Sequence, residues 1–262
     1  MGFTELFIYS LIQGVTEFLP ISSSAHLLLL EGVFNWESAS RTYAIAAHLG
    51  TLLTLLFFLR LDIYNLLKNV RIKETKKNQY NKLLFNITII TTPVIIFGFL
   101  IFKTLDNFLL SIEILGWASI IGALLLLIAD KLPYNNKTIL DLSFKESIFI
   151  GILQSFSLIP GSSRAGMIIT ASRFLKISRK NSTKIALFSG IPTITAAVIL
   201  EFYWLFNHAY QFFTLKLVML ILMSSIFSYL TIVFLLKWLN KNSFLPFIIY
   251  RLILGIIILV LI

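Results

Sequence analysis

Cysteine is absent from the 262 residues, and charged residues are scarce. Without a thiol the chain forms no disulfide and has no cysteine nucleophile, so thiol and redox chemistry are excluded. Only 13% of the residues are charged, 58% are hydrophobic, and the mean hydropathy is +0.90. This composition excludes an ordinary soluble domain. Apolar runs long enough to cross about 30 Å of hydrocarbon recur along the chain, so we predict an all-α polytopic membrane protein.

Acidic residues are few as well, with 12 Asp and Glu against 22 Lys and Arg. The resulting net charge of +10 is compatible with nucleic-acid binding, but the basic residues lie in short loops between apolar runs. That placement is typical of the positive-inside rule, so we expect no nucleic-acid partner. The first basic residue is Arg41, too late for the positive start of a cleavable signal peptide, and we expect none.

Six apolar runs are predicted to be complete membrane crossings: 42–60, 84–102, 112–130, 184–204, 215–237 and 244–262. The connections that carry Lys and Arg are predicted to be cytoplasmic, namely 60–82, 131–146 and 173–184. The 205–214 connection has neither Lys nor Arg and is predicted to lie outside the cell membrane. These assignments place both termini outside.

Two segments, 4–32 and 146–176, have a proline-centred polar break in an otherwise apolar run. Irregular backbone at membrane depth is tolerated only inside protein or beside a water-filled cavity, so we predict two re-entrant helical hairpins. A shift of 140 residues places Pro20 on Pro160 and Ser22 on Ser162. We therefore predict a single membrane domain, 1–262, built from repeats at about 1–131 and 141–262. Each half has three crossings, so the second repeat is inverted, as in many transporters.

The second break reads "LIPGSSRAG". Pro160 and Gly161 end one helix, and Ser162 or Ser163 can cap the next. A helix start offers free N–H groups to an anion, and the guanidinium of Arg164 matches two phosphate oxygens. These groups predict a phosphate cradle. The alternative is a capped helix whose arginine extends to the membrane surface.

The first break, "QGVTEFLPISSSAH", supplies acid and base groups. Gln13 and Glu17 are four residues apart and share a helix face. A carboxylate inside a membrane is a functional hypothesis by default, and Glu17 is a candidate general base, divalent-cation ligand or ion-pair partner of Arg164. His26 follows the serines and suits proton transfer near neutral pH.

Several other polar residues have a structural interpretation. Arg173 lies near a basic connection and is expected to extend to the membrane surface, and His48 and His208 are expected to be structural. Serines at a helix start are most often caps. One of the serines is a candidate nucleophile towards phosphorus, an activated water is the alternative, and the sequence leaves both open. The serines concerned are Ser22, Ser23, Ser24, Ser162 and Ser163.

Taken together, "QGVTEFLPISSSAHL" and "LIPGSSRAG" resemble the bacterial undecaprenyl-diphosphate phosphatase family, also called the bacitracin-resistance family. The stretches "HLGTLLTLLFF" (48–58), "LLLLIADK" (124–131) and "FIIYRLILGIIIL" (247–259) extend the resemblance over the whole chain. It implies removal of the terminal phosphate from a polyprenyl diphosphate at the outer face of the bacterial plasma membrane. That reaction regenerates the lipid carrier for cell-wall synthesis, and a divalent cation, Mg²⁺ or Ca²⁺, takes part.

The resemblance assigns roles residue by residue. The catalytic residues it implies are Glu17, His26, Ser23, Ser163 and Arg164, with Glu17 as a metal ligand. The substrate-binding residues are Gln13, Ser22, Gly161, Ser162 and Arg164.

Two positions depart from the family pattern. Gln13 stands where many members have Glu, which weakens a metal-ligand role there. Ala165 and Ile168 replace hydroxyl residues that often follow the arginine. The rival function is a transporter that flips the polyprenyl phosphate carrier, because inverted repeats are a transport architecture. A homodimer is one candidate assembly.

Overall fold

The computed structural model describes residues 2–34, 41–69, 75–104, 111–208 and 214–260. Over these ranges the chain is helical, without a strand beyond one isolated bridge between Asn135 and Ile177. The α-helices there are α1 (Phe3–Thr16), α2 (Ser23–Phe34), α3 (Arg41–Phe58), α4 (Arg60–Asn69), α5 (Thr75–Thr104), α6 (Ile112–Lys131), α7 (Phe144–Ser155), α8 (Arg164–Phe174), α9 (Arg179–His208), α10 (Leu215–Trp238) and α11 (Leu245–Val260). Two short 3₁₀ helices, η2 (Ile139–Asp141) and η3 (Phe156–Leu158), flank α7.

Every predicted crossing coincides with a helix. Four helices, α5, α6, α9 and α10, are long and apolar enough to cross a membrane. A fifth candidate is α3 with α4, which are joined by a bend of 67°, and α11 is a shorter apolar helix. The all-α membrane class is therefore confirmed, whereas the arrangement of six crossings and two re-entrant hairpins stays a prediction.

The prediction that residues 60–82 form a basic loop was wrong with respect to their conformation. Much of it is helical, since α4 covers 60–69 and α5 begins at Thr75. Asp62 in the first turn of α4 and Lys68 in its last turn both suit the helix dipole. Basic residues indicate on which side of a membrane a connection lies, and they are also good helix formers.

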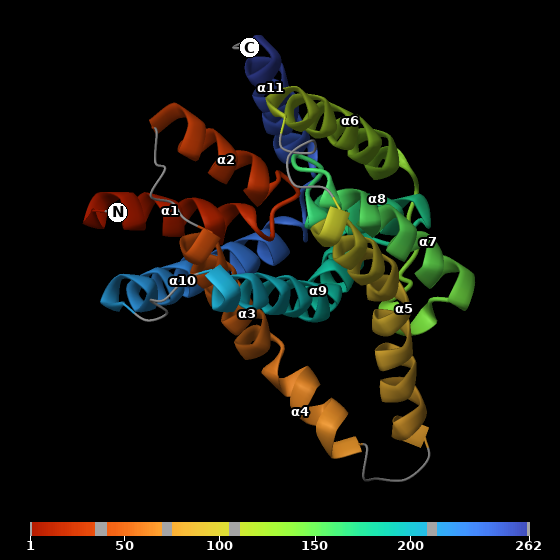
Figure 1. Cartoon of the computed structure of the whole chain (residues 1–262). Coiled ribbons are helices and arrows are strands. Elements are labelled where there is room, and N and C mark those ends of the chain that lie inside the picture. Colours follow the sequence, from red (N-terminus) through yellow and green to blue (C-terminus); the bar gives the residue numbers. More distant parts are fainter. Residues whose placement is uncertain (1, 35–40, 70–74, 105–110, 209–213, 261–262) are drawn as a thin grey trace.

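Both predicted broken segments are present as helix pairs. A first turn, residues 17–22, separates α1 from α2, and a second turn, residues 156–163, separates α7 from α8. In Figure 1 the two pairs approach from opposite sides, and their turns meet at the centre of the molecule. Helix α1 packs against α10, and α7 packs against α5, so each pair lies against a long helix of the other half. Such reciprocal packing between the two halves is compatible with an inverted repeat, and the repeat stays a prediction.

Close backbone contacts fix the position of the first turn. A Cβ atom at Gly14 of α1 would lie 2.5 Å from the Cβ of Phe227, and one at Gly50 of α3 would lie 2.4 Å from the carbonyl oxygen of Ile221. Only glycine allows α10 to approach both helices so closely. Helix α8 fixes the second turn, because all its residues from Ala165 to Arg173 are buried.

Candidate active site

The two turns enclose a cavity of about 200 Å³. It is lined by Glu17, Ser22, Ser23, Ser24, His48, Val94, Ser157, Leu158, Ser163, Arg164, Thr193, Ile194 and Ala197. Residues predicted from both polar breaks therefore come together, although more than a hundred residues separate them in the sequence. Ser157 and Thr193 add hydroxyls that the sequence analysis did not identify.

Glu17 connects the two turns. It follows the last residue of α1 and is 7% exposed. Its Oε1 accepts a hydrogen bond from Nη2 of Arg164 at 2.8 Å. Its Oε2 accepts from Oγ of Ser23 at 2.8 Å and from Nε2 of Gln13 at 3.1 Å. Gln13 is fully buried behind the carboxylate and does not line the cavity, so it acts on the site through Glu17.

Arg164 is the first residue of α8 and is held on both sides. Besides the ion pair with Glu17, its Nη1 donates to the carbonyl oxygen of Ala186 at 3.0 Å. A Cβ at Gly190 would lie 2.5 Å from that same Nη1, so the guanidinium lies directly against α9. The first turns of α2 and α8 both begin at the cavity wall, and two positive helix ends therefore face it.

The serines divide into caps and a serine bonded to a carboxylate. Oγ of Ser163 accepts from the N–H of Gly166 at 3.1 Å, and Oγ of Ser22 accepts from the N–H of Ala25 at 3.4 Å. Oγ of Ser24 lies within hydrogen-bond distance of Oγ of Ser22, at 3.1 Å. Ser23 instead donates a hydrogen bond to Oε2 of Glu17. This is the geometry of a nucleophile beside a general base.

Gly161 and Ser162 do not line the cavity, although both were predicted to bind substrate. Gly161 has φ +95°, and a Cβ there would lie 2.4 Å from the carbonyl oxygen of Leu115. The carbonyl groups of both residues point away from the cavity and toward Arg251. Their substrate-binding roles stay predictions, and their observed role is to shape the turn.

Arg251 of α11 is a site residue that the sequence analysis missed. It is fully buried, and its Nη2 donates to the carbonyl oxygens of Gly161 and Ser162, each at 2.8 Å. Its Nη1 lies 3.5 Å from the carbonyl oxygen of Pro20, so a single guanidinium contacts both turns. The available signal was an arginine in the apolar run 247–259, where an ionisable side chain requires an explanation.

His26 lies outside the cavity. Its Nδ1 is 2.7 Å from the carbonyl oxygen of Ser22, and its Nε2 is 2.6 Å from the hydroxyl of Tyr250. The His26 and Tyr250 rings are stacked at 4°. Because a carbonyl oxygen only accepts, Nδ1 carries a proton, and in a neutral ring Nε2 would then accept from the hydroxyl of Tyr250. The partners of His26 are thus Ser22 and Tyr250, and its catalytic role stays a prediction.

His48, in contrast to His26, lines the cavity. Its Nε2 lies 3.8 Å from Oε2 of Glu17, and its Nδ1 is bonded to the carbonyl oxygen of Ala44 at 2.8 Å. We expected a structural histidine here, but the structure places its imidazole in the site. Only the fold reveals this, because 31 residues separate His48 from Glu17 in the sequence. The side chain of His208 lies outside the described residues.

The expectation that Arg173 extends to the membrane surface was wrong. Its side chain is 1% exposed and donates to the carbonyl oxygens of Ile177 at 2.6 Å and Asp130 at 3.1 Å, and also to that of Leu132. The last carbonyl groups of a helix have no partner within it, and Arg173 satisfies such groups at the end of α6. The carboxylate Oδ1 of Asp130 also lies 3.5 Å from Nε of Arg173.

The donor set does not fit a divalent cation held by protein ligands alone. Across the described ranges, no three His, Asp or Glu side chains gather into a metal-binding group. Glu17 is the single carboxylate in the cavity lining, and both of its oxygens already accept hydrogen bonds. Cations such as Mg²⁺ and Ca²⁺ require several oxygen ligands.

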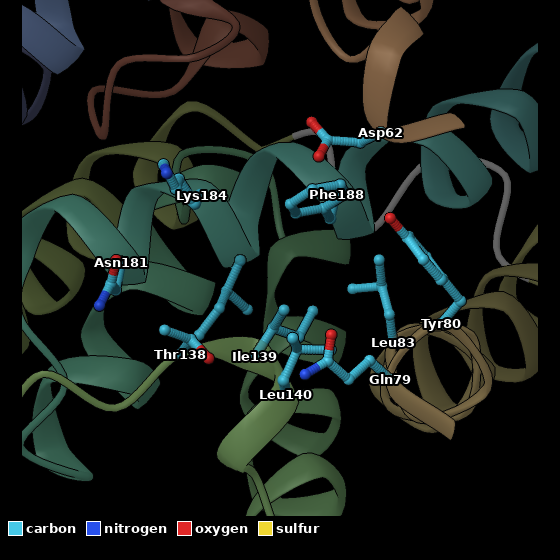
Figure 2. A pocket seen from close by; sticks show the side chains of 11 residues that line it. Asp62, Gln79, Tyr80, Leu83, Thr138, Ile139, Leu140, Asn181, Lys184 and Phe188 are labelled. Carbon is cyan, nitrogen blue, oxygen red and sulfur yellow. The ribbon is translucent and has the colours of Figure 1, made fainter. Parts of the chain in front are cut away.

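A separate cavity of about 270 Å³ lies between α4, α5, α9 and η2. Figure 2 shows Lys184 and Asn181 at one end and Gln79 and Tyr80 at the other, with Phe188 and other apolar side chains between them. None of the residues predicted to be functional lines it. The cavity between the two turns is therefore the candidate active site.

Known proteins of one family are similar to this chain over nearly its full length. Residues 6–257 match the family described as bacitracin resistance protein BacA. An undecaprenyl-diphosphatase of Pelagibacter ubique (strain HTCC1062) is 38% identical over an alignment 265 positions long, which covers 98% of this chain and 97% of the relative. Undecaprenyl-diphosphatases of Idiomarina loihiensis and Campylobacter curvus (strain 525.92) are each 32% identical. The alignments cover 98% and 99% of this chain, respectively, and 98% of each relative.

Proposed function

The chain belongs to the bacitracin resistance protein BacA family, and we propose that its undecaprenyl-diphosphatase activity is carried out in the cavity between the two turns. The reaction converts undecaprenyl diphosphate to undecaprenyl phosphate and inorganic phosphate. The observation that carries the assignment is the chain of contacts from Ser23 through Glu17 to Arg164, with two hydrogen bonds of 2.8 Å. It joins a nucleophile, a base and a phosphate-binding cation.

The terminal phosphoryl group binds where the starts of α2 and α8 converge. Arg164 and the helix N-termini stabilise the charge on its oxygens, and this contact strengthens in the transition state. Oγ of Ser23 attacks phosphorus as its proton passes to Glu17, and the bond to the bridging oxygen breaks. Undecaprenyl phosphate leaves. After that proton has moved on from Glu17 to His48, water attacks the phosphoserine and passes a proton to the ionised Glu17. Glu17 returns this proton to Oγ of Ser23 as the phosphorus–Oγ bond breaks, and inorganic phosphate is released.

His48 is positioned to assist this proton transfer. It lines the cavity and lies 3.8 Å from the Glu17 carboxylate, so it can accept the proton that Glu17 takes from Ser23. We expect His48→Gln to lower kcat more than it raises KM, because the side chain serves the chemical step. A change in KM alone would remove His48 from the mechanism.

A divalent cation is proposed to enter with the substrate. The diphosphate supplies several oxygen ligands, whereas the cavity offers one carboxylate that is already bonded. The cation therefore belongs to the substrate as its counter-ion. The chain's own residues bind and orient the phosphoryl group.

The polyprenyl chain is proposed to occupy an apolar groove of about 730 Å³ on the other side of the second turn. Trp117, Ile121 and Leu125 of α6 form one wall, and residues of α7 and η3 form the other. Ser162 lines this groove, and the next residue, Ser163, lines the catalytic cavity. The groove thus begins one residue from the phosphate site.

The cavity is proposed to open toward the outer face of the bacterial plasma membrane, with both termini outside. Basic residues gather at the end of α8, at the start of α9 and around η2. By the positive-inside rule, this end of the molecule is expected to face the cytoplasm. Cysteine is absent, so single introduced cysteines report cleanly. A membrane-impermeant thiol reagent should label Thr214→Cys in intact cells and Lys145→Cys only after lysis. The reverse order would overturn the orientation.

Phosphate release by the purified protein in detergent tests the function. Without a bilayer to cross, transport cannot contribute to the signal. We expect the parent to release phosphate from undecaprenyl diphosphate and Glu17→Gln to lose about 10²–10⁴-fold in rate. Acid quenching during turnover of substrate labelled in its terminal phosphate should trap label on the parent but not on Ser23→Ala. Turnover without any trapped label would favour attack by water.

A further inference from the structure

Two adjoining cavities lie at the end of the molecule where α6 and α8 end and α9 begins. The larger, about 410 Å³, extends along the start of α11, and the smaller, about 250 Å³, lies against the turn between α10 and α11. They share Tyr134 and Arg179 as a common wall. We call the pair the basic double cavity. None of the residues that line the catalytic cavity lines it.

Cations dominate its lining. Five basic residues face a single carboxylate, that of Asp130; they are Lys131, Arg173, Arg179, Lys180 and Lys241. Asp130 is already bonded to Nε of Arg179 at 2.6 Å and to the backbone N–H of Phe244 at 3.3 Å. The lysines therefore keep most of their charge uncompensated. Helix α9 begins at Arg179, so its positive end adds to the same field.

The larger cavity is apolar below this charge. Leu127, Leu245 and Ile248 line it, on two helices that pack against each other within the proposed membrane span. Trp238 lies beside the α10–α11 turn, where its Nε1 donates to the carbonyl oxygen of Ser243 at 3.1 Å. Tryptophan with a polar partner is typical of the headgroup level of a bilayer. The basic double cavity thus combines a cationic mouth with an apolar floor at that level.

We propose that the basic double cavity binds an anionic phospholipid, with its phosphate at Arg179, Lys180 and Lys241 and an acyl chain along Leu127 and Ile248. Charge complementarity supports this occupant, because a basic pocket between membrane helices attracts an anionic headgroup. The site lies at the opposite end of α8 from the catalytic cavity. Arg173 and Arg164 are nine residues apart on this helix, about 14 Å along its axis.

Thermal unfolding in detergent tests the proposal with three additives: phosphatidylglycerol, phosphatidylcholine and inorganic phosphate. We expect phosphatidylglycerol to raise the Tm of the parent by about 5 °C at concentrations well above its Kd. Lys180→Gln with Lys241→Gln should lose most of this rise, since both side chains are exposed and lie at the mouth. Phosphatidylcholine and inorganic phosphate should leave the Tm unchanged.

Lys82→Gln with Lys145→Gln is the matched control, because it removes the same charge from exposed positions outside the basic double cavity. It should keep the full rise. Phosphate release from the substrate in lipid-free detergent should be equal in parent and both double variants, which separates this site from the catalytic one. If the Lys180 and Lys241 pair does not fold, Lys241→Gln alone should lose about half of the rise.

Three results would overturn the proposal. An equal rise with phosphatidylcholine would mean that any lipid fills the apolar floor. An equal rise with inorganic phosphate would identify a free-anion site rather than a lipid site. A full rise in the Lys180 and Lys241 variant would place the lipid elsewhere on the protein.

Discussion

Ser22 and Ser163 both have a positive φ angle at the starts of α2 and α8. The φ angle is 72° at Ser22 and 66° at Ser163, in the left-handed region that disfavours side chains. In both cases the hydroxyl accepts from the N–H three residues further on. The helix starts thus pair Ser22 with Ser163, one residue beyond the sequence pairing of Ser22 with Ser162. Strain of this kind is found at functional sites.

The strain at Ser163 can be measured by replacing it with glycine and alanine. Both replacements lose the hydroxyl that caps α8, but glycine relieves the strain of the positive φ, whereas alanine keeps it. We expect the free energy of unfolding of Ser163→Ala to lie below that of Ser163→Gly by about 2 kcal/mol. Ser111 caps α6 at φ −65°, so the same pair of substitutions there should differ by about 1 kcal/mol or less. Equal differences at the two positions would mean that Ser163 is unstrained.

Arg164 should not tolerate lysine. An ammonium keeps the charge but loses the planar fork that contacts Glu17 and the Ala186 carbonyl and that is proposed to bind phosphate. We expect Arg164→Lys to lower kcat by about 10²-fold in the detergent assay. Arg60→Lys, on an exposed side chain, should be nearly silent. Arg173→Lys should lower stability instead, because its guanidinium serves three buried carbonyl groups. Full activity in Arg164→Lys would remove the clamp from the mechanism.

Gln13→Glu should increase the dependence on divalent cations beyond that of the parent. The amide now donates to Glu17 at 3.1 Å, and a carboxylate there would place two like charges together in a buried site. A cation bridging both would relieve the repulsion. We expect the variant to be less active than the parent in chelator and to recover when Mg²⁺ or Ca²⁺ is added. Gln154→Glu, which faces Thr193 rather than a carboxylate, should not recover. Recovery of both variants would point to a general effect of the cation on the substrate.

His26 and Tyr250 should act as a unit. Their 2.6 Å contact and the bond from His26 to the Ser22 carbonyl hold the strained turn beside Ser23. We expect His26→Gln and Tyr250→Phe each to lower kcat, and the double variant to lose little more than His26→Gln alone. The measurement is a double-mutant cycle on phosphate release. Additive losses would show that His26 works independently of Tyr250, as a proton-transfer residue in its own right.

The apolar groove should select for chain length. Ile121→Trp on the groove wall should raise KM for undecaprenyl diphosphate about tenfold and leave the short farnesyl diphosphate unaffected, since only the long chain fills the groove. Ile128→Trp, on the same helix and equally exposed but outside the groove, is the control. An equal effect on both substrates would place the polyprenyl chain elsewhere.

The helices and both turns could be predicted because their signals are local. Apolar runs of membrane length mark helices, and Pro20 and Pro160 within polar clusters mark the breaks. The partners of isolated side chains could not be predicted, because they depend on contacts between distant helices. His48 and Arg251 looked like single polar residues in apolar helices, yet one enters the cavity and the other binds both turns. Arg173 was misread for the same reason, since two of its three carbonyl partners lie at the end of α6.

Arg251 has a consequence for synthesis of the protein. It belongs to α11, which follows every other described helix in the chain, and it supplies the donor that holds the carbonyl groups of both turns. During insertion into the membrane, Glu17, Ser23 and Arg164 enter the bilayer well before α11 leaves the ribosome. The turns therefore lack their shared donor until the last helix packs. A nascent chain should be unable to act on the lipid carrier, so that catalytic competence marks the completion of folding.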